Sequence, residues 1–259
     1  MAKKFIFIFL LIVFLVNSKI FSQQNKNSGI KDLQSIFQKI SEEIKYAEGL
    51  NKAQLTILSD KKIRIYKILH YLKKNKSLFL FNSVKNGKDL KILYDYDKLN
   101  IYIYDYVIKK VYKKSIYDFS LNVLKSDFTV FDIINRPLIE DYRVDEEYSI
   151  ENDNIMKFKI FPIKENNYSF IEIYVDENSN YQVKRFDYYD KSKVLMKRLE
   201  FDYGKFSIKE KDDTSLKEYP IKWKVTNVTL NHISILEFFN NTKDIPIKKE
   251  LFDIKYIQN

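Results

Sequence analysis

Residues 89–104 read DLKILYDYDKLNIYIY, and this stretch decides the fold. Apolar and aromatic residues occupy every second position of residues 90–96, and Ile and Tyr alternate through residues 101–104. A period of two is typical of β-strands whose two faces meet different surroundings. The polar pair Asp97-Lys98 lies between the runs, so the stretch predicts two antiparallel strands joined by a tight turn.

The same alternation recurs along most of the chain and predicts ten or eleven strands. Short polar breaks such as Asn86-Gly87 separate the runs, so hairpins are expected to join the strands into an antiparallel sheet. One break is longer, because no strand is expected between about Lys114 and Asn154. Further runs are Leu55/Ile57, Ile63/Ile65, Ile171/Ile173/Val175 and Ile221/Trp223/Val225.

Two segments depart from this period and predict helices. The first is expected over residues 31–47, with Gly49 as its stop, because apolar residues recur at spacings of three and four. The second is a short helix in the long break, for which Ser126 or Asp127 is the expected N-cap. The apolar face of the first is Leu33, Ile36, Phe37, Ile40 and Ile44, and that of the second is Phe128, Phe131 and Ile134.

Composition and element order predict one α+β domain over residues 23–259. The 259-residue chain is 45% apolar, has four Gly and four Pro, and carries 20 Tyr and 20 Phe, which favours strands. Two helices cannot cover one face of ten twisted strands, so the sheet must curl on itself. We expect a large curled antiparallel sheet, an incomplete β-barrel, whose N-terminal helix and inserted helix cover an apolar cavity. Residues 78–81, Leu-Phe-Leu-Phe, are apolar on both faces, so one face should meet the cavity and the other a helix or lid.

The N-terminus resembles a secretory signal peptide over residues 1–22. Lys3 and Lys4 precede the apolar block of residues 5–16, and Ser22 offers a small residue at the cut. A retained N-terminal anchor is the alternative, and either reading places the body of the protein outside the cytoplasm. The formal charge of +10 loses three lysines at this cut, which leaves +7. Because acidic residues are interleaved with the lysines, we expect no nucleic-acid partner and a weak attraction to anionic lipid.

The residues present exclude several chemistries. No cysteine is available for disulfides, thiolate metal sites or a lipid-modified N-terminal cysteine, and the four glycines lie too far apart for a phosphate-binding loop. His70 and His232, the only histidines, lie in strand-like contexts, where a surface position or a hydrogen-bonded buried histidine is expected. Glu146-Glu147 falls in a segment that reads as a turn. We therefore predict no enzymatic activity, no catalytic residue, no metal site and no cofactor.

Three local sequences resemble the LolA-like family of periplasmic outer membrane lipoprotein carriers, also labelled outer membrane lipoprotein-sorting proteins. Residues 101–104 and 109–114 are similar to a family strand of the form W-x-Y-x-P followed by basic residues, but with tyrosines and without the proline. Residues 126–132, SDFTVFD, resemble the S-D-F-S/T-x-x-D-L signature, with Ile133 in place of leucine. Residues 219–252 resemble the closing pattern P-x-x…T…I-P-x-x-x-F.

The resemblance implies an unclosed antiparallel barrel with helices as a lid and a cavity that receives acyl chains. The expected lid helix carries Phe128, Phe131 and Ile134, and Arg64 lies in the region where the family uses an arginine to hold its lid. We expect the acyl-chain cavity to be lined by Phe79, Phe81, Ile101, Ile103, Ile171, Ile173, Trp223 and Val225.

The expected function is that of a periplasmic carrier that shields the acyl chains of lipoproteins or lipids between the inner and outer membranes. The resemblance implies an acylated lipoprotein or lipid as cargo, an inner-membrane release complex, an outer-membrane acceptor, transient membrane contact and a monomer. Two alternatives stay open: a periplasmic protein-interaction or sensor module of the same fold, and a structural envelope protein with a packed interior.

Overall fold

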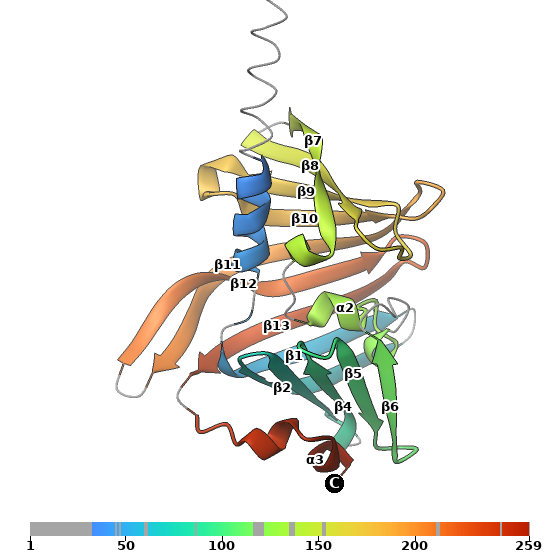
Figure 1. Ribbon diagram of the computed structural model, residues 1–259, viewed down its shortest axis with the longest axis vertical. Helices are drawn as coiled ribbons and strands as arrows, with labels where there is room; N and C mark the ends of the chain where they lie inside the picture. The colour runs from blue at the N-terminus through green and yellow to red at the C-terminus, as the bar shows by residue number, and fades with distance from the viewer. Residues whose placement is uncertain are drawn as a thin grey trace, which may run out of the picture.

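A computed structural model describes residues 33–44, 46, 48–59, 62–85, 87–115, 122–134, 138–151, 154–210, 213–243 and 245–258 (Figure 1). The signal-peptide prediction for residues 1–22 lies outside these residues. Within them, no helix is long and apolar enough to cross a membrane.

The described chain forms a single 13-stranded sheet in the order β6-β5-β4-β3-β2-β1-β13-β12-β11-β10-β9-β8-β7. Neighbours in this order pair antiparallel, and the end of β13 also pairs in parallel with β11. The strands are β1 Gly49–Ser59, β2 Lys62–Lys73, β3 Lys76–Ser83, β4 Gly87–Asp95, β5 Asn100–Asp105, β6 Lys110–Ser115, β7 Tyr142–Glu151, β8 Ile155–Pro162, β9 Phe170–Asp176, β10 Gln182–Tyr189, β11 Leu195–Glu210, β12 Asp213–Asn227 and β13 His232–Thr242.

The predicted curled, unclosed antiparallel sheet is confirmed, although the expected number of strands was too low. β7 lies where no strand was predicted, and Glu146-Glu147 belongs to it rather than to a turn. Most of β7 is exposed and its register with β8 shifts between Val144 and Tyr148, so its sequence lacks the apolar alternation of a half-buried strand. β6 and β7 are the two edges of the described sheet.

The first predicted helix is present over residues 33–43. Leu33, Ile36, Phe37 and Ile40 are buried in the main apolar cluster, as their spacing predicted. In Figure 1 this helix, drawn in blue, lies across the half of the sheet that contains β8 to β11.

The second predicted helix is shorter than expected and begins later. α2 spans Val130–Ile133, and its N-cap is Thr129, not Ser126 or Asp127. The Thr129 side chain and the Asp132 carboxylate form a reciprocal capping box. Phe128 therefore precedes the helix and Ile134 follows it as the C-cap, so the three predicted lid residues do not share one helical face.

The C-terminus covers the outer face of β3, β4 and β5. The helix α3, Ile254–Gln258, follows η5, Lys249–Phe252. Phe252 of η5 and Ile257 of α3 pack in a second apolar cluster with Leu78 of β3. Phe79 and Phe81 face the main cluster on the other side. The expectation that residues 78–81 are covered on both faces is confirmed, and the cover on the outer face is C-terminal. The remaining short 3-10 helices are η1 Val123–Lys125, η2 Leu138–Glu140 and η4 Glu177–Ser179.

Candidate functional site

The inner face of the sheet carries a continuous aromatic and aliphatic core. The eight residues predicted to line a cavity are all buried in it: Phe79, Phe81, Ile101, Ile103, Ile171, Ile173, Trp223 and Val225. The eight residues thus share the main cluster, although the alternation by itself did not fix which face of each strand points inward. Their role in binding an acyl chain stays a prediction.

Trp223 lies at the centre of this core. Its ring stacks on Tyr46 with centroids 5.5 Å apart, and it meets Phe201 and Phe238 edge-on at 5.4 and 5.6 Å. The indole Nε1 donates to the Pro220 carbonyl at 2.9 Å, which satisfies its one polar atom. The aromatic side chains therefore form a packed, hydrogen-bonded group.

Residues 122–134, here called the crossing segment, lie over the inner face on the connection between the edge strands β6 and β7 (Figure 1). Phe128 is fully buried and lines a cleft of about 10 Å³ with residues of β1, β2, β3 and β13. Phe131 and Ile134 instead line a second cleft of about 40 Å³ beside Trp223 and Tyr46. Both clefts have at most room for a water or two, so the crossing segment nearly fills the space beneath it.

A larger cavity of about 470 Å³ opens beside the crossing segment. Of the eight predicted lining residues, only Ile103 contributes to this cavity. Phe79 and Phe81 line the cleft beneath Phe128. Trp223 lines the cleft beside Phe131. Ile101, Ile171, Ile173 and Val225 line none of these three spaces. The walls of the large cavity are Arg64, Tyr66, Leu90, Ile92, Ile103, Asp105, Val107, Tyr112, Lys114, Asn122, Val123, Leu124, Lys125 and Val130.

Arg64 of β2 holds the first turn of the crossing segment. Its Nη1 donates to the Leu124 carbonyl at 3.3 Å and its Nη2 to the Lys125 carbonyl at 3.4 Å. Leu124 and Lys125 both have positive φ, 54° and 60°, a conformation that costs energy for side chains other than glycine. Arg64 thus contacts the crossing segment, and its role in holding a lid stays a prediction.

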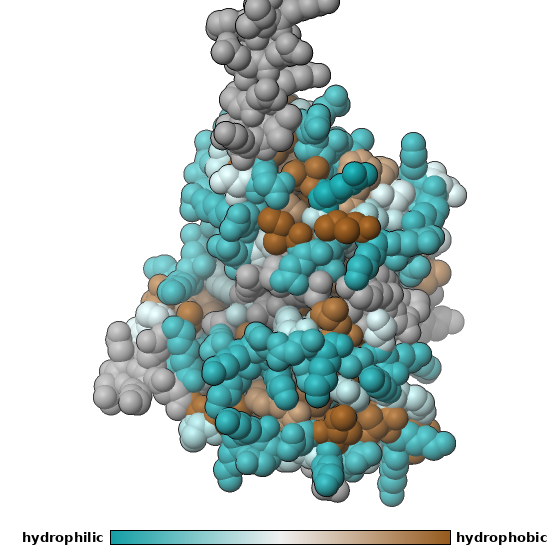
Figure 2. All heavy atoms as spheres, in the orientation of Figure 1, coloured by the Kyte–Doolittle hydropathy of each residue, from teal (hydrophilic) through white to brown (hydrophobic). Residues whose placement is uncertain are grey.

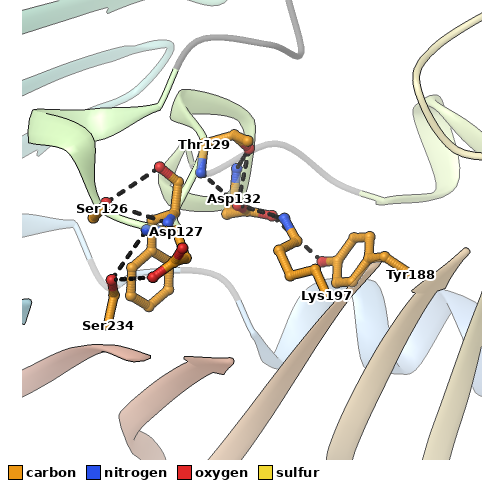
Figure 3. Close-up of polar contacts among 8 residues, drawn as sticks. Ser126, Asp127, Thr129, Asp132, Tyr188, Lys197 and Ser234 are labelled. Carbon is orange, nitrogen blue, oxygen red and sulfur yellow. Dashed lines mark hydrogen bonds and ion pairs between the residues drawn. The ribbon is translucent and has the colours of Figure 1, made fainter. Parts of the chain in front are cut away.

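A second contact fixes the segment to β13. Ser234 Oγ donates to the Asp127 carboxylate at 2.8 Å and accepts the Asp127 N–H at 3.0 Å (Figure 3). Ser126 Oγ accepts the Phe128 N–H at 3.2 Å. These bonds fix the main chain just before Phe128, whose ring lies in the core.

A third contact fixes the segment to β11 through a buried ion pair. Lys197 Nζ lies 2.8 Å from both Asp132 carboxylate oxygens, and the two side chains are 7% and 1% exposed. Thr129 N–H and Tyr188 OH also donate to this carboxylate, at 2.6 and 3.4 Å (Figure 3). Burial by itself lowers the pKa of Lys197, but the Asp132 carboxylate and Tyr168 outweigh burial and raise it, so the Lys197 ammonium stays charged at neutral pH.

Sequence reasoning missed Lys197 and Ser234. Lys197 lies in a strand where lysine ordinarily marks the exposed face, and Ser234 occupies a core-facing position of β13 without any distinguishing pattern. The available signal was Asp132, an acid in the quoted signature beside apolar residues, which requires a donor if it is buried.

His70 is a hydrogen-bonded buried histidine, which is one of the two environments that the sequence left open for it. Its Nε2 lies 2.6 Å from Ser77 Oγ, and its ring stacks on Phe79 at 3.9 Å. Burial lowers its pKa to about 3, so the ring is neutral at physiological pH. Among the described residues, no group of three or more His, Asp and Glu side chains could hold a metal ion.

Comparison with known proteins relates this geometry to a fold. A family model described only as "uncharacterized protein" matches residues 73–259. No curated protein sequence matches the chain.

Solved structures match over nearly the whole chain. A domain from Vibrio parahaemolyticus described as an outer membrane lipoprotein-sorting protein has a TM-score of 0.68 at 15% identity, covering 90% of this chain and 100% of that one. A DUF1329 family protein from Desulfovibrio piger has a TM-score of 0.68 at 17% identity, with 88% and 98% covered. A LolA superfamily protein from Nitrosomonas europaea has a TM-score of 0.62 at 16% identity, with 86% and 98% covered.

Proposed function

This chain belongs to the family of uncharacterized proteins whose model it matches and has the LolA-like fold, and from that premise we propose that it carries acyl chains of lipoproteins or lipids across the periplasm. The proposal includes export by a signal peptide over residues 1–22, a single carrier domain over residues 23–259, a monomeric state and binding without catalysis. An inner-membrane release complex would load the carrier and an outer-membrane acceptor would unload it.

The observation that carries the proposal is the crossing segment itself. A short segment with one fully buried aromatic, Phe128, covers an apolar inner face, and hydrogen bonds and one ion pair attach it to β2, β13 and β11. A packed structural domain also needs its core covered, but only a carrier needs a cover that opens. We propose that the crossing segment is the lid, and that moving Phe128 and Phe131 outward joins the two small clefts to the cavity of about 470 Å³.

The energy of transfer sets how such a lid works. Each CH2 group removed from water contributes about 0.8 kcal/mol, so complete burial of a chain of about 16 carbons would contribute roughly 12 kcal/mol, too much for ready release. The volume of about 470 Å³ falls within the range of about 300–1,000 Å³ that is usual for small-ligand sites. A carrier with this cavity would hold the chain incompletely and release it when the lid opens.

Native mass spectrometry of residues 23–259, purified from their own envelope without detergent, tests the proposal. We expect bound mass that matches acylated species, and displacement of a fluorescent fatty acid added to the protein. Phe128→Asp and Phe131→Asp should abolish retention, whereas Leu216→Asp, an equally drastic change at a 62% exposed position of β12, should leave it intact. An empty protein that binds no fatty acid would contradict the carrier function and favour a protein partner.

A further inference from the structure

The turn between β5 and β6 exposes apolar side chains at the end of a hairpin. Val107 is 80% exposed and Ile108 is 49% exposed, and together they form the tip of the turn. In Figure 2, apolar side chains lie at the lower right, over the region where Figure 1 draws β4, β5 and β6. Adjacent apolar side chains that stay exposed do not contribute buried area to the fold. Such a patch points to contact with a membrane or another molecule.

The turn is fixed in the conformation that exposes these residues. The Asp105 carboxylate accepts the N–H groups of Val107 and Ile108 at 2.8 and 3.3 Å. Lys109 follows with a positive φ of 51°, which reverses the chain into β6. Because the Asp105 carboxylate binds the main chain of both apolar residues, their side chains stay exposed at the tip of the turn.

Positive charge surrounds the tip. Lys109 and Lys110 follow the apolar pair directly, and Lys113 lies three residues further along β6; all three are exposed. Within the described part of the chain, no carboxylate pairs with Lys109 or Lys110. Two apolar side chains next to unpaired lysines match the chemistry of an anionic lipid surface, where apolar groups enter the acyl boundary and ammonium groups meet the headgroups.

Neighbouring turns add to the same surface. Strand pairing places the β1–β2 turn and the β3–β4 turn at the same end of the sheet as the β5–β6 turn. Ile63 and Val84 at these turns are 68% and 61% exposed, and the Val84 N–H donates to the Ile65 carbonyl at 3.2 Å. This end of the β2–β6 half of the sheet therefore exposes apolar side chains at three turns.

The tip also borders the large cavity. Asp105, Val107 and Tyr112 line the cavity of about 470 Å³, which places its mouth beside the exposed turn. We propose that residues 106–110 bind the surface of a bilayer that contains anionic phospholipid and thereby place the mouth of this cavity against the membrane. The membrane contact stands on the turn alone, and its use in loading or delivering an acyl chain rests on the proposed function.

Vesicle sedimentation tests the contact with the full mature chain. We expect binding to vesicles of phosphatidylcholine mixed with phosphatidylglycerol, and much weaker binding to phosphatidylcholine alone. Val107→Asp with Ile108→Asp should weaken binding more than about tenfold. Lys109→Gln with Lys110→Gln should weaken it about 30-fold and remove most of its salt dependence. Leu216→Asp, at an exposed apolar position on the opposite end of the sheet, is the matched control.

A second measurement reports insertion directly. Because the chain has no cysteine, Val107→Cys and Leu216→Cys each accept one environment-sensitive dye. The dye at position 107 should shift to the emission of an apolar environment on mixed vesicles, and the dye at position 216 should not.

Three results would overturn the proposal: wild-type binding that does not depend on anionic lipid, unchanged binding of the Val107/Ile108 variant, or equal dye shifts at both positions. Fatty-acid binding in solution is measured on the Lys109/Lys110 variant and should be unaffected, because neither lysine lines the cavity. A protein that binds vesicles through the turn but takes up no fatty acid would retain the membrane site and contradict only the carrier function.

Discussion

Replacing Lys197 by methionine should loosen the crossing segment without unfolding the sheet. The substitution keeps most of the side-chain volume but leaves the Asp132 carboxylate buried, with Thr129 and Tyr188 as its remaining donors. Breaking a buried ion pair on one side costs about 3–5 kcal/mol, and the remaining donors favour the lower end. If the cost falls on local opening, about 3 kcal/mol corresponds to roughly a 100-fold larger open population.

Hydrogen exchange measures this opening. The Asp132 and Ile134 amides, bonded to the Thr129 and Val130 carbonyls, should exchange about 100-fold faster in Lys197→Met, while Leu69 in the centre of β2 should keep its protection. The double variant with Asp132→Asn removes both charges and should regain most of the protection. Unchanged protection in the single variant, or equal loss of protection at Leu69, would refute the conclusion that the Lys197–Asp132 ion pair holds the crossing segment locally.

Three further changes test other parts of the structure. Arg64→Ala removes two hydrogen bonds to the crossing segment and should speed exchange of the Ser126 amide by about tenfold, with Arg64→Lys as the milder control. Burial lowers the pKa of His70 in the folded protein to about 3, whereas in the unfolded chain it is about 6.5. The stability that the neutral His70 contributes is therefore fully present above about pH 6.5 and is lost as the pH falls toward about 3. Denaturant titration between about pH 6 and 4 should show the wild type losing about 1.4 kcal/mol per pH unit more than His70→Gln. Gly49→Ala should lower the melting temperature, because Gly49 has a φ of 112° and a Cβ there would overlap the Thr242 carbonyl.

Alternation predicted the sheet well because burial on one face imposes a period of two. Ile171 and Ile173 of β9 and Trp223 and Val225 of β12 alternate with residues on the other face, and all four lie in the main cluster. β7 could not be found in this way, because an exposed edge strand has no apolar face to impose a pattern.

The sequence predicted a short helix in the crossing segment but not the residue that caps it. Sequence reasoning chose Ser126 or Asp127 as the N-cap because both are good capping residues just before an apolar run. In the structure both side chains are engaged elsewhere: Ser126 accepts the Phe128 N–H and Asp127 pairs with Ser234 of β13, 107 residues away. Local propensity cannot register a partner so distant in sequence, and Thr129 takes the cap instead.

The attachment of the crossing segment suits a cover that must close in one place and still open. An apolar attachment of equal area would favour burial in any register, and it would compete with an acyl chain for the same inner face. A buried ion pair instead recovers little net free energy, because desolvation of Lys197 and Asp132 offsets most of their attraction, yet it tolerates few other geometries.

The contacts of Arg64 and of Ser234 with the same segment are directional in the same way. The three contacts therefore specify where the crossing segment docks on the sheet, but they contribute little net free energy to keeping it docked. On the proposed carrier function, replacing both Lys197 and Asp132 by apolar residues should keep the fold but slow the opening of the crossing segment, and with it the release of bound fatty acid.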